Sequence, residues 1–173
     1  MKRLRKTRNV LQYAAGSVIC LVLMTAVVAG QQDELAQVRR ATAWFHRVES
    51  AQAAHYHPMA GLDHCIANPG VGAMGYHYFN AELIADVSPP DPLRPEAMVY
   101  APGPDGKLHL AAVEWVVPAK AWHAAGNTEP PSVLGKPMHI LNPVLGWYIL
   151  HAWIWRPNPA GMFEDWNPNV TCP

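Results

Sequence analysis

Two long apolar runs constrain the fold of this chain more than any other feature. Residues 108–118 read LHLAAVEWVVP and residues 146–156 read GWYILHAWIWR. Both are rich in β-branched and aromatic residues, which favour extended strands. Each run also has one ionisable residue near its centre, Glu114 in the first and His151 in the second. The sequence therefore predicts two buried strands that each carry a polar side chain.

The remaining patterns add strands and a helix. Residues 73–80 and 96–102 are also predicted strands, and the Asp-Gly turn in PGPDGK predicts a hairpin between 96–102 and 108–118. Residues 32–54 have apolar positions at steps of three and four, which predicts a helix. A short helical turn is expected at ELIAD, and residues 119–144 are expected to be a loop. Together these elements predict an α+β fold, with an N-terminal helix packed on a mainly antiparallel sheet of about four strands.

The first thirty residues have the order of an export signal. Five basic residues precede an apolar run that ends in Ala29 and Gly30. We therefore expect residues 1–30 to be an export signal peptide and residues 31–173 to be a single domain with an irregular C-terminal tail. The alternative is an uncleaved N-terminal anchor, because the apolar run approaches the length of a membrane span.

Removal of this signal would change the charge of the chain. Five of the 13 basic residues lie in it, whereas all 13 acidic residues follow it, so eight basic residues remain and the net charge is −5. An acidic domain lacks the basic patch that nucleic-acid binding requires. No later segment is long and apolar enough to span a bilayer, so the mature form is expected to be free of the membrane.

The cysteines also suggest export. Cys20 lies in the signal, which leaves Cys65 and Cys172. Two cysteines in an oxidising compartment most simply form one disulfide, and this one would close a loop of about a hundred residues. Free thiols and metal-binding thiols are the alternatives.

A possible metal site follows from the alternation of side chains along the strands. His77, Glu114 and His151 each lie among apolar neighbours on a different predicted strand. A buried carboxylate needs a partner, and the two histidines are the obvious candidates. Two imidazoles and a carboxylate can bind copper, zinc, iron or manganese. We therefore expect an exported metal-binding protein, with His64 as a fourth ligand and with a metal suited to oxidative or hydrolytic chemistry.

Two other functions fit the same residues. A metal-free pocket could bind a small apolar or aromatic ligand, with Trp153, Trp155 and Tyr76 in its walls. Alternatively, the polar residues form a plain structural cluster, the tryptophans pack in the core, and the chain is a structural envelope protein. The sequence does not indicate an oligomeric state.

Several motifs taken together resemble a known group of sequences. MGYHYFN, RPEAMVY, LHLAAVEWVVP, LHAWIW and NPAGMFEDWNP are similar to motifs of an uncharacterised family of small secreted bacterial proteins. The resemblance covers roughly residues 36–173. It implies a bacterial, exported, single-domain protein and implies no catalytic residue. The chain departs from the family at AAHYHP, where such proteins have an Ala-rich stretch that ends in Gly-Tyr.

Overall fold

The computed structural model describes residue 30 and residues 32–173. The predicted export signal therefore lies outside the described residues, apart from residue 30. The chain divides into two compact units, residues 1–36 and residues 37–173. The second unit holds the sheet, the pocket and the disulfide. Its elements are η1 (Ala43–His46), α2 (Val48–Ala53), β1 (Tyr56–His57), β2 (Ile66–Asn68), β3 (Gly72–Asn80), α3 (Ala81–Ala85), β4 (Ala97–Pro102), β5 (Leu108–Pro118), α4 (Ala119–Ala124), β6 (Ser132–Val133), β7 (Lys136–Pro137) and β8 (Trp147–Ala152).

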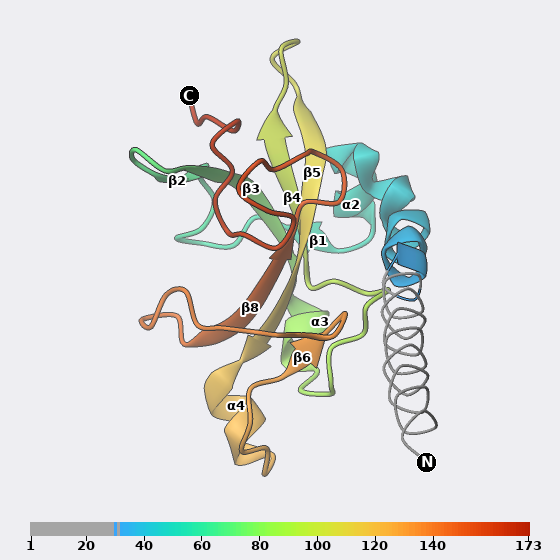
Figure 1. The fold of residues 1–173 in the computed structure, drawn as a ribbon, viewed down its shortest axis with the longest axis vertical. Coiled ribbons are helices and arrows are strands. Elements are labelled where there is room, and N and C mark those ends of the chain that lie inside the picture. The colour runs from blue at the N-terminus through green and yellow to red at the C-terminus, as the bar shows by residue number, and fades with distance from the viewer. Residues whose placement is uncertain (1–29, 31) are drawn as a thin grey trace, which may run out of the picture. The chain divides into compact units, whose positions relative to one another are not determined.

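The sheet is antiparallel throughout and confirms the predicted α+β class. Its strands run in the order β1-β3-β4-β5-β8, and β2 pairs with one part of β3 (Figure 1). The four predicted strands appear as β3, β4, β5 and β8, but β8 ends at Ala152, four residues before the predicted end of the last strand. The predicted loop over residues 119–144 instead contains α4 and the small β6–β7 hairpin. The helix α4 begins where β5 ends, and the Trp122 indole that anchors it donates to the Glu129 carbonyl.

The prediction of one continuous helix over residues 32–54 is wrong. Helical backbone covers residues 32–42, η1 follows, and Arg47 is extended before α2 begins. The Phe45 carbonyl accepts a hydrogen bond from the Tyr100 hydroxyl at 2.7 Å, so it bonds to the sheet. A hydrogen bond to the sheet thus uses a carbonyl group that a regular helix would bond within itself.

Two irregularities break the strict alternation of side chains in the sheet. Val99 pairs with Ala112 while Tyr100 pairs with Leu110, so β5 carries one extra residue there. At the same level of β3, Gly75 has a φ of 108°, and a Cβ on it would lie 2.3 Å from the carbonyl oxygen of Tyr100. Only glycine fits this position, because it combines a left-handed backbone with close approach to β4.

The two faces of the sheet have different coverings. On one face, Met98, Tyr100, Val113 and Trp115 are fully buried, and η1 and α2 contact β5. The Trp115 indole donates to the Asp91 carbonyl in the connector before β4. The opposite face carries the polar residues of the candidate site. The C-terminal tail covers part of this second face.

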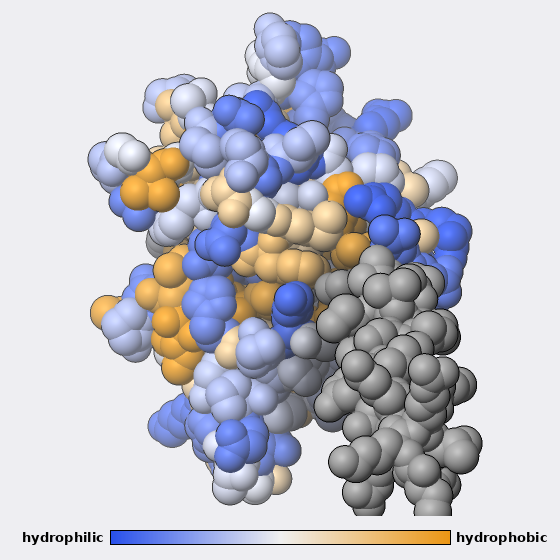
Figure 2. Space-filling view, in the orientation of Figure 1, coloured by the Kyte–Doolittle hydropathy of each residue, from blue (hydrophilic) through white to orange (hydrophobic). Residues whose placement is uncertain are grey.

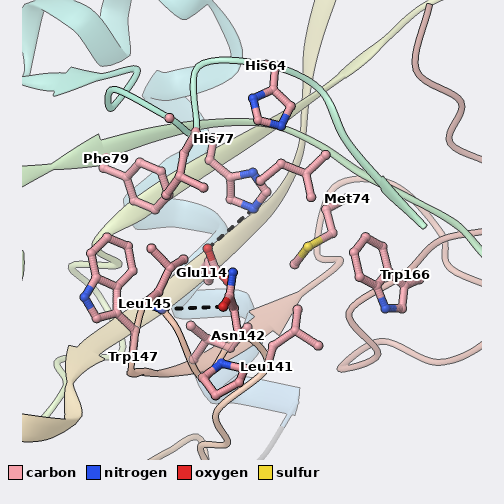
Figure 3. Close-up of a pocket in the computed structure, with 15 residues that line it drawn as sticks. His64, Met74, His77, Phe79, Glu114, Leu141, Asn142, Leu145, Trp147 and Trp166 are labelled. Atoms are coloured by element: carbon pink, nitrogen blue, oxygen red, sulfur yellow. Dashed lines mark hydrogen bonds and ion pairs between the residues drawn. The ribbon is translucent and has the colours of Figure 1, made fainter.

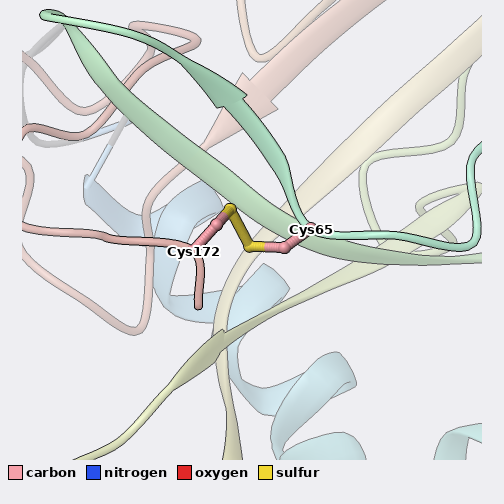
Figure 4. The surroundings of a disulfide bond; sticks show 2 residues. All are labelled: Cys65 and Cys172. Carbon is pink, nitrogen blue, oxygen red and sulfur yellow. A yellow bond between two sulfur atoms is a disulfide. The ribbon is translucent and has the colours of Figure 1, made fainter.

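The tail is held by one buried asparagine and by the disulfide. The backbone of Asn167 exchanges two hydrogen bonds with Ala73, and its side chain donates to the Pro157 carbonyl. Cys65 and Cys172 form the predicted disulfide, which ties the end of the tail to the segment that enters β2 (Figure 4). The tail therefore has a fixed path across the sheet.

None of the helices in the described part of the chain combines the length and the apolar character needed to cross a membrane.

Candidate functional site

The register of the sheet places the three predicted polar residues on one face. Glu114 lies directly opposite His151 on β8. His77 lies opposite Val99, which lies opposite Ala112, two residues before Glu114. Since residues two apart on a strand share a face, His77, Glu114 and His151 point to the same side of the sheet.

A pocket of about 610 Å³ opens over this face. Aromatic rings lie on two sides of it, with Phe79 and Trp147 on one side, Trp166 on the other, and the His77–Glu114 pair between them (Figure 3). The remaining walls come from the segment before β2, from Met74 on β3, from Ile149 on β8 and from the loop before β8. The full lining is Gly61, Leu62, His64, Ile66, Met74, His77, Phe79, Glu114, Leu141, Asn142, Pro143, Leu145, Trp147, Ile149 and Trp166.

His77 and Glu114 form a buried polar pair in the pocket. The Nε2 atom of His77 and the Oε2 atom of Glu114 are 3.4 Å apart, longer than an ordinary N–H···O hydrogen bond. Burial raises the pKa of Glu114 to about 8, and the carboxylates of Asp165 and Glu96 add to the rise. Burial lowers the pKa of His77 to about 4; the Gly75 backbone opposes this lowering, although the ring Nδ1 has no well-formed hydrogen bond. At neutral pH the contact therefore joins an undissociated acid to a neutral imidazole, although its distance would also suit an ion pair.

His151 lies beneath the pocket. It is fully buried, it is absent from the pocket lining, and neither of its ring nitrogens has a hydrogen-bond partner among the described residues. Its ring is 4.7 Å from that of Trp153 and 6.0 Å from that of His77, measured between centroids. Burial holds the pKa of His151 well below its ordinary value, and His77 adds to the effect. This neutral imidazole is a rare case of a buried polar ring without a partner.

The other predicted site residues lie in different places. His64 is exposed and stands at the rim of the pocket. Trp153 is buried beneath the tail, where its indole donates to the Glu164 carbonyl. The Trp155 indole donates to the Thr42 hydroxyl. Tyr76 lines a smaller pocket of about 410 Å³ beside Pro58, Tyr78 and Pro102. None of these three aromatic residues lines the larger pocket.

Two parts of the site were not anticipated from the sequence. The first is the loop of residues 140–145, which supplies one wall and exposes apolar side chains, among them Val144 at 92%. Figure 2 shows apolar residues gathered across the middle and the left side of this view. The run ILNPVL could have marked this loop, since four of its residues are apolar in a segment without regular structure.

The second unanticipated part is Asp165 in the tail. Its Oδ2 atom is 2.9 Å from the Nε2 atom of His139, whereas its Oδ1 atom is buried and has no hydrogen-bond partner in the described part of the chain. The charge of Asp165 contributes to the raised pKa of Glu114. The neighbouring residues Phe163, Glu164 and Trp166 did not indicate that Asp165 belongs to the site, because only the fold brings the tail over the sheet.

Among residue 30 and residues 32–173, no group of three or more His, Cys, Asp or Glu side chains is arranged to hold a metal ion. His77 and Glu114 reach the pocket together, but His151 remains beneath it and His64 remains at the rim. The four predicted ligands therefore do not converge on one point in this conformation.

Comparison with family models, curated proteins and solved structures finds no match to this chain. The resemblance to small secreted bacterial proteins therefore stays a prediction.

Proposed function

We propose that this protein binds a small, mainly apolar molecule in the pocket above His77 and Glu114. The observation that carries this proposal is a pocket of about 610 Å³ whose wall is largely apolar and aromatic around a single buried polar pair. Ligand pockets typically measure about 300–1,000 Å³ and combine apolar walls with a few polar groups that orient the ligand.

The polar pair gives the pocket its directionality. An undissociated Glu114 can donate one hydrogen bond to a ligand, and a neutral His77 can accept one or donate one. The aromatic rings of Phe79, Trp147 and Trp166 would pack on the apolar body of the ligand. The fixed tail supports a preformed site, since Trp166 immediately precedes the buried Asn167.

A neutral fluorescent probe tests this proposal. N-phenyl-1-naphthylamine should bind with a stoichiometry of one and should quench the tryptophans that line the pocket. Leu62→Trp would place a bulky ring in the lining and should abolish binding, whereas Val71→Trp, at an exposed turn outside the pocket, should not. If the two variants bind the probe as the wild type does, the pocket is not the binding site.

A transition metal is the second candidate ligand. The 3.4 Å between His77 Nε2 and Glu114 Oε2 is close to the separation of two ligands on a tetrahedral zinc ion with bonds of about 2.0–2.1 Å. The unpartnered ring nitrogens of His151 also favour this candidate. A metal held in this way would require His151 to move toward the pair.

Elemental mass spectrometry tests whether the protein binds a transition metal at this site. The protein would be purified without chelators or a histidine tag and then offered zinc, copper, iron and manganese separately. Metal near one equivalent in the wild type and its loss in His151→Ala would establish the site. Equal metal content in both proteins, or none in either, would contradict it.

We further propose that the protein is exported. The N-terminal pattern of residues 1–30 and the disulfide between Cys65 and Cys172 both support this location. N-terminal sequencing of protein recovered outside the cytoplasm should give a chain that begins near residue 31. A full-length chain with reduced cysteines in the cytoplasm would contradict export.

A further inference from the structure

The acidic side chains at the pocket are not matched by permanently basic ones. Glu114 is the only carboxyl group in the lining, and no lysine or arginine lines the pocket in the described part of the chain. The only basic side chains in the lining are the imidazoles of His64 and His77. Further negative charge comes from Asp165 and Glu96, which are near enough to raise the pKa of Glu114. Once Glu114 loses its proton, the surroundings therefore oppose an anionic ligand and favour a cationic one.

The carboxyl group of Glu114 is available to a ligand. Its side chain is 95% buried, since 5% is exposed, yet it reaches the pocket beside His77 (Figure 3). Its one close ionisable neighbour is a neutral imidazole, which does not neutralise a carboxylate. Asp165 has a buried Oδ1 atom that no described hydrogen-bond donor satisfies. Among the described residues, Glu114 thus has no lysine or arginine partner, whereas Asp165 lies beside the half-exposed imidazole of His139.

The aromatic walls suit the same kind of ligand. Phe79 and Trp147 stand on one side of Glu114 and Trp166 on the other (Figure 3). The faces of aromatic rings attract a cation, and indole rings do so most strongly. Groups of aromatic rings are a common binding site for quaternary ammonium ligands.

We propose that the pocket binds an organic cation, with an ammonium group held by Glu114 and the aromatic rings and an apolar body against Met74, Ile149 and the 141–145 loop. This inference rests on the proposed function and specifies the class of ligand. The groups that face Glu114 are His77 from β3, His151 from β8, Asp165 from the tail and Glu96 beside β4. None of these groups supplies a permanent positive charge.

Two probes of one shape test the inference. Phenyltrimethylammonium and tert-butylbenzene have the same arrangement of heavy atoms and differ in one charge. Their affinities for the disulfide-bonded protein would be measured by quenching of tryptophan fluorescence at pH 8.5, above the pKa of Glu114. We expect the cation to bind at least tenfold more tightly than its neutral counterpart.

Two variants test whether Glu114 causes the preference for the cationic probe. Glu114→Gln keeps the shape of the undissociated acid and should reduce the ratio of the two affinities severalfold, leaving only the preference that the aromatic rings provide. Glu49→Gln is the matched control, because its side chain is 72% exposed, and it should leave the ratio unchanged. The wild-type comparison stands even if Glu114→Gln fails to fold, since it needs no variant.

Each outcome has a distinct meaning. If tert-butylbenzene binds as tightly as the cation, the charge inference is overturned while the proposed pocket function survives. If neither probe binds but N-phenyl-1-naphthylamine does, only the charge inference is overturned; if none of the three binds, both are overturned. If the cation is preferred equally in the wild type and in a folded Glu114→Gln variant, Glu114 does not hold the ammonium group and the proposal fails.

Discussion

Replacing Glu114 with glutamine should change how the stability of this protein depends on pH. The ordinary pKa of a glutamate is 4.5, and burial raises that of Glu114 to about 8 in the fold. Between these two values the folded chain keeps a proton that the unfolded chain has released. Stability therefore decreases as pH rises through this window, because the folded state binds more protons. Glutamine resembles the protonated acid and cannot lose a proton.

The magnitude follows from the size of the shift. Each pH unit between 4.5 and 8 should remove roughly 1.4 kcal/mol from the stability of the wild type relative to Glu114→Gln. The accumulated loss is about 3 kcal/mol at pH 7 and about 4 kcal/mol at pH 8. This is a large share of the stability of an ordinary domain. Glu96 and His77 titrate in both proteins, so the difference isolates Glu114.

Guanidinium denaturation of both proteins from pH 5 to pH 8, with the disulfide intact, measures this difference. The unfolding free energy of Glu114→Gln should move progressively above that of the wild type as pH rises. Glu49→Gln, which alters an exposed side chain, should run parallel to the wild type. A difference that stays constant with pH, or that changes in favour of the wild type, would refute the reasoning. It would mean that the fold does not raise the pKa of Glu114.

Three further changes test how the site is held. Replacing Cys65 and Cys172 with serine should remove about 4–5 kcal/mol of stability, because the disulfide joins residues 107 positions apart; a loss below about 1 kcal/mol in chemical denaturation would contradict this expectation. Gly75→Ala should reduce the stability several times more than Gly106→Ala, since both glycines have positive φ but only Gly75 meets the backbone of β4. Equal shifts in thermal midpoint would show that the close approach is unimportant. Asn167→Ala should cost about 2–3 kcal/mol by leaving buried polar groups unpaired, and it should also expose the neighbouring tryptophan, seen as a red shift in emission; an unchanged spectrum would indicate that the tail is fixed by other contacts.

Local sequence patterns determined much of the sheet. Residues 108–118 form β5 with the predicted bounds, because β-branched and aromatic side chains favour extended backbone whatever the strand pairs with. The Asp-Gly turn joined β4 to β5 for an equally local reason. Alternation with a period of two also identified His77, Glu114 and His151 as ionisable residues among apolar neighbours, but the register between the strands placed them on one face. The disulfide followed from the presence of only two cysteines after the predicted signal.

Only the tertiary structure decided which of these residues meet a ligand. Trp153 and Trp166 are 13 positions apart, and nothing in their neighbourhoods distinguishes the tryptophan beneath the tail from the one that lines the pocket. The same holds for His151, which lies under the pocket, and for His77, which lines it. The physical reason is that alternation reports a side chain's face, whereas access to a pocket depends on what packs over that face. Here the cover comes from segments distant in sequence from His77 and Glu114, namely the 141–145 loop and a tail fixed by Asn167 and Cys172.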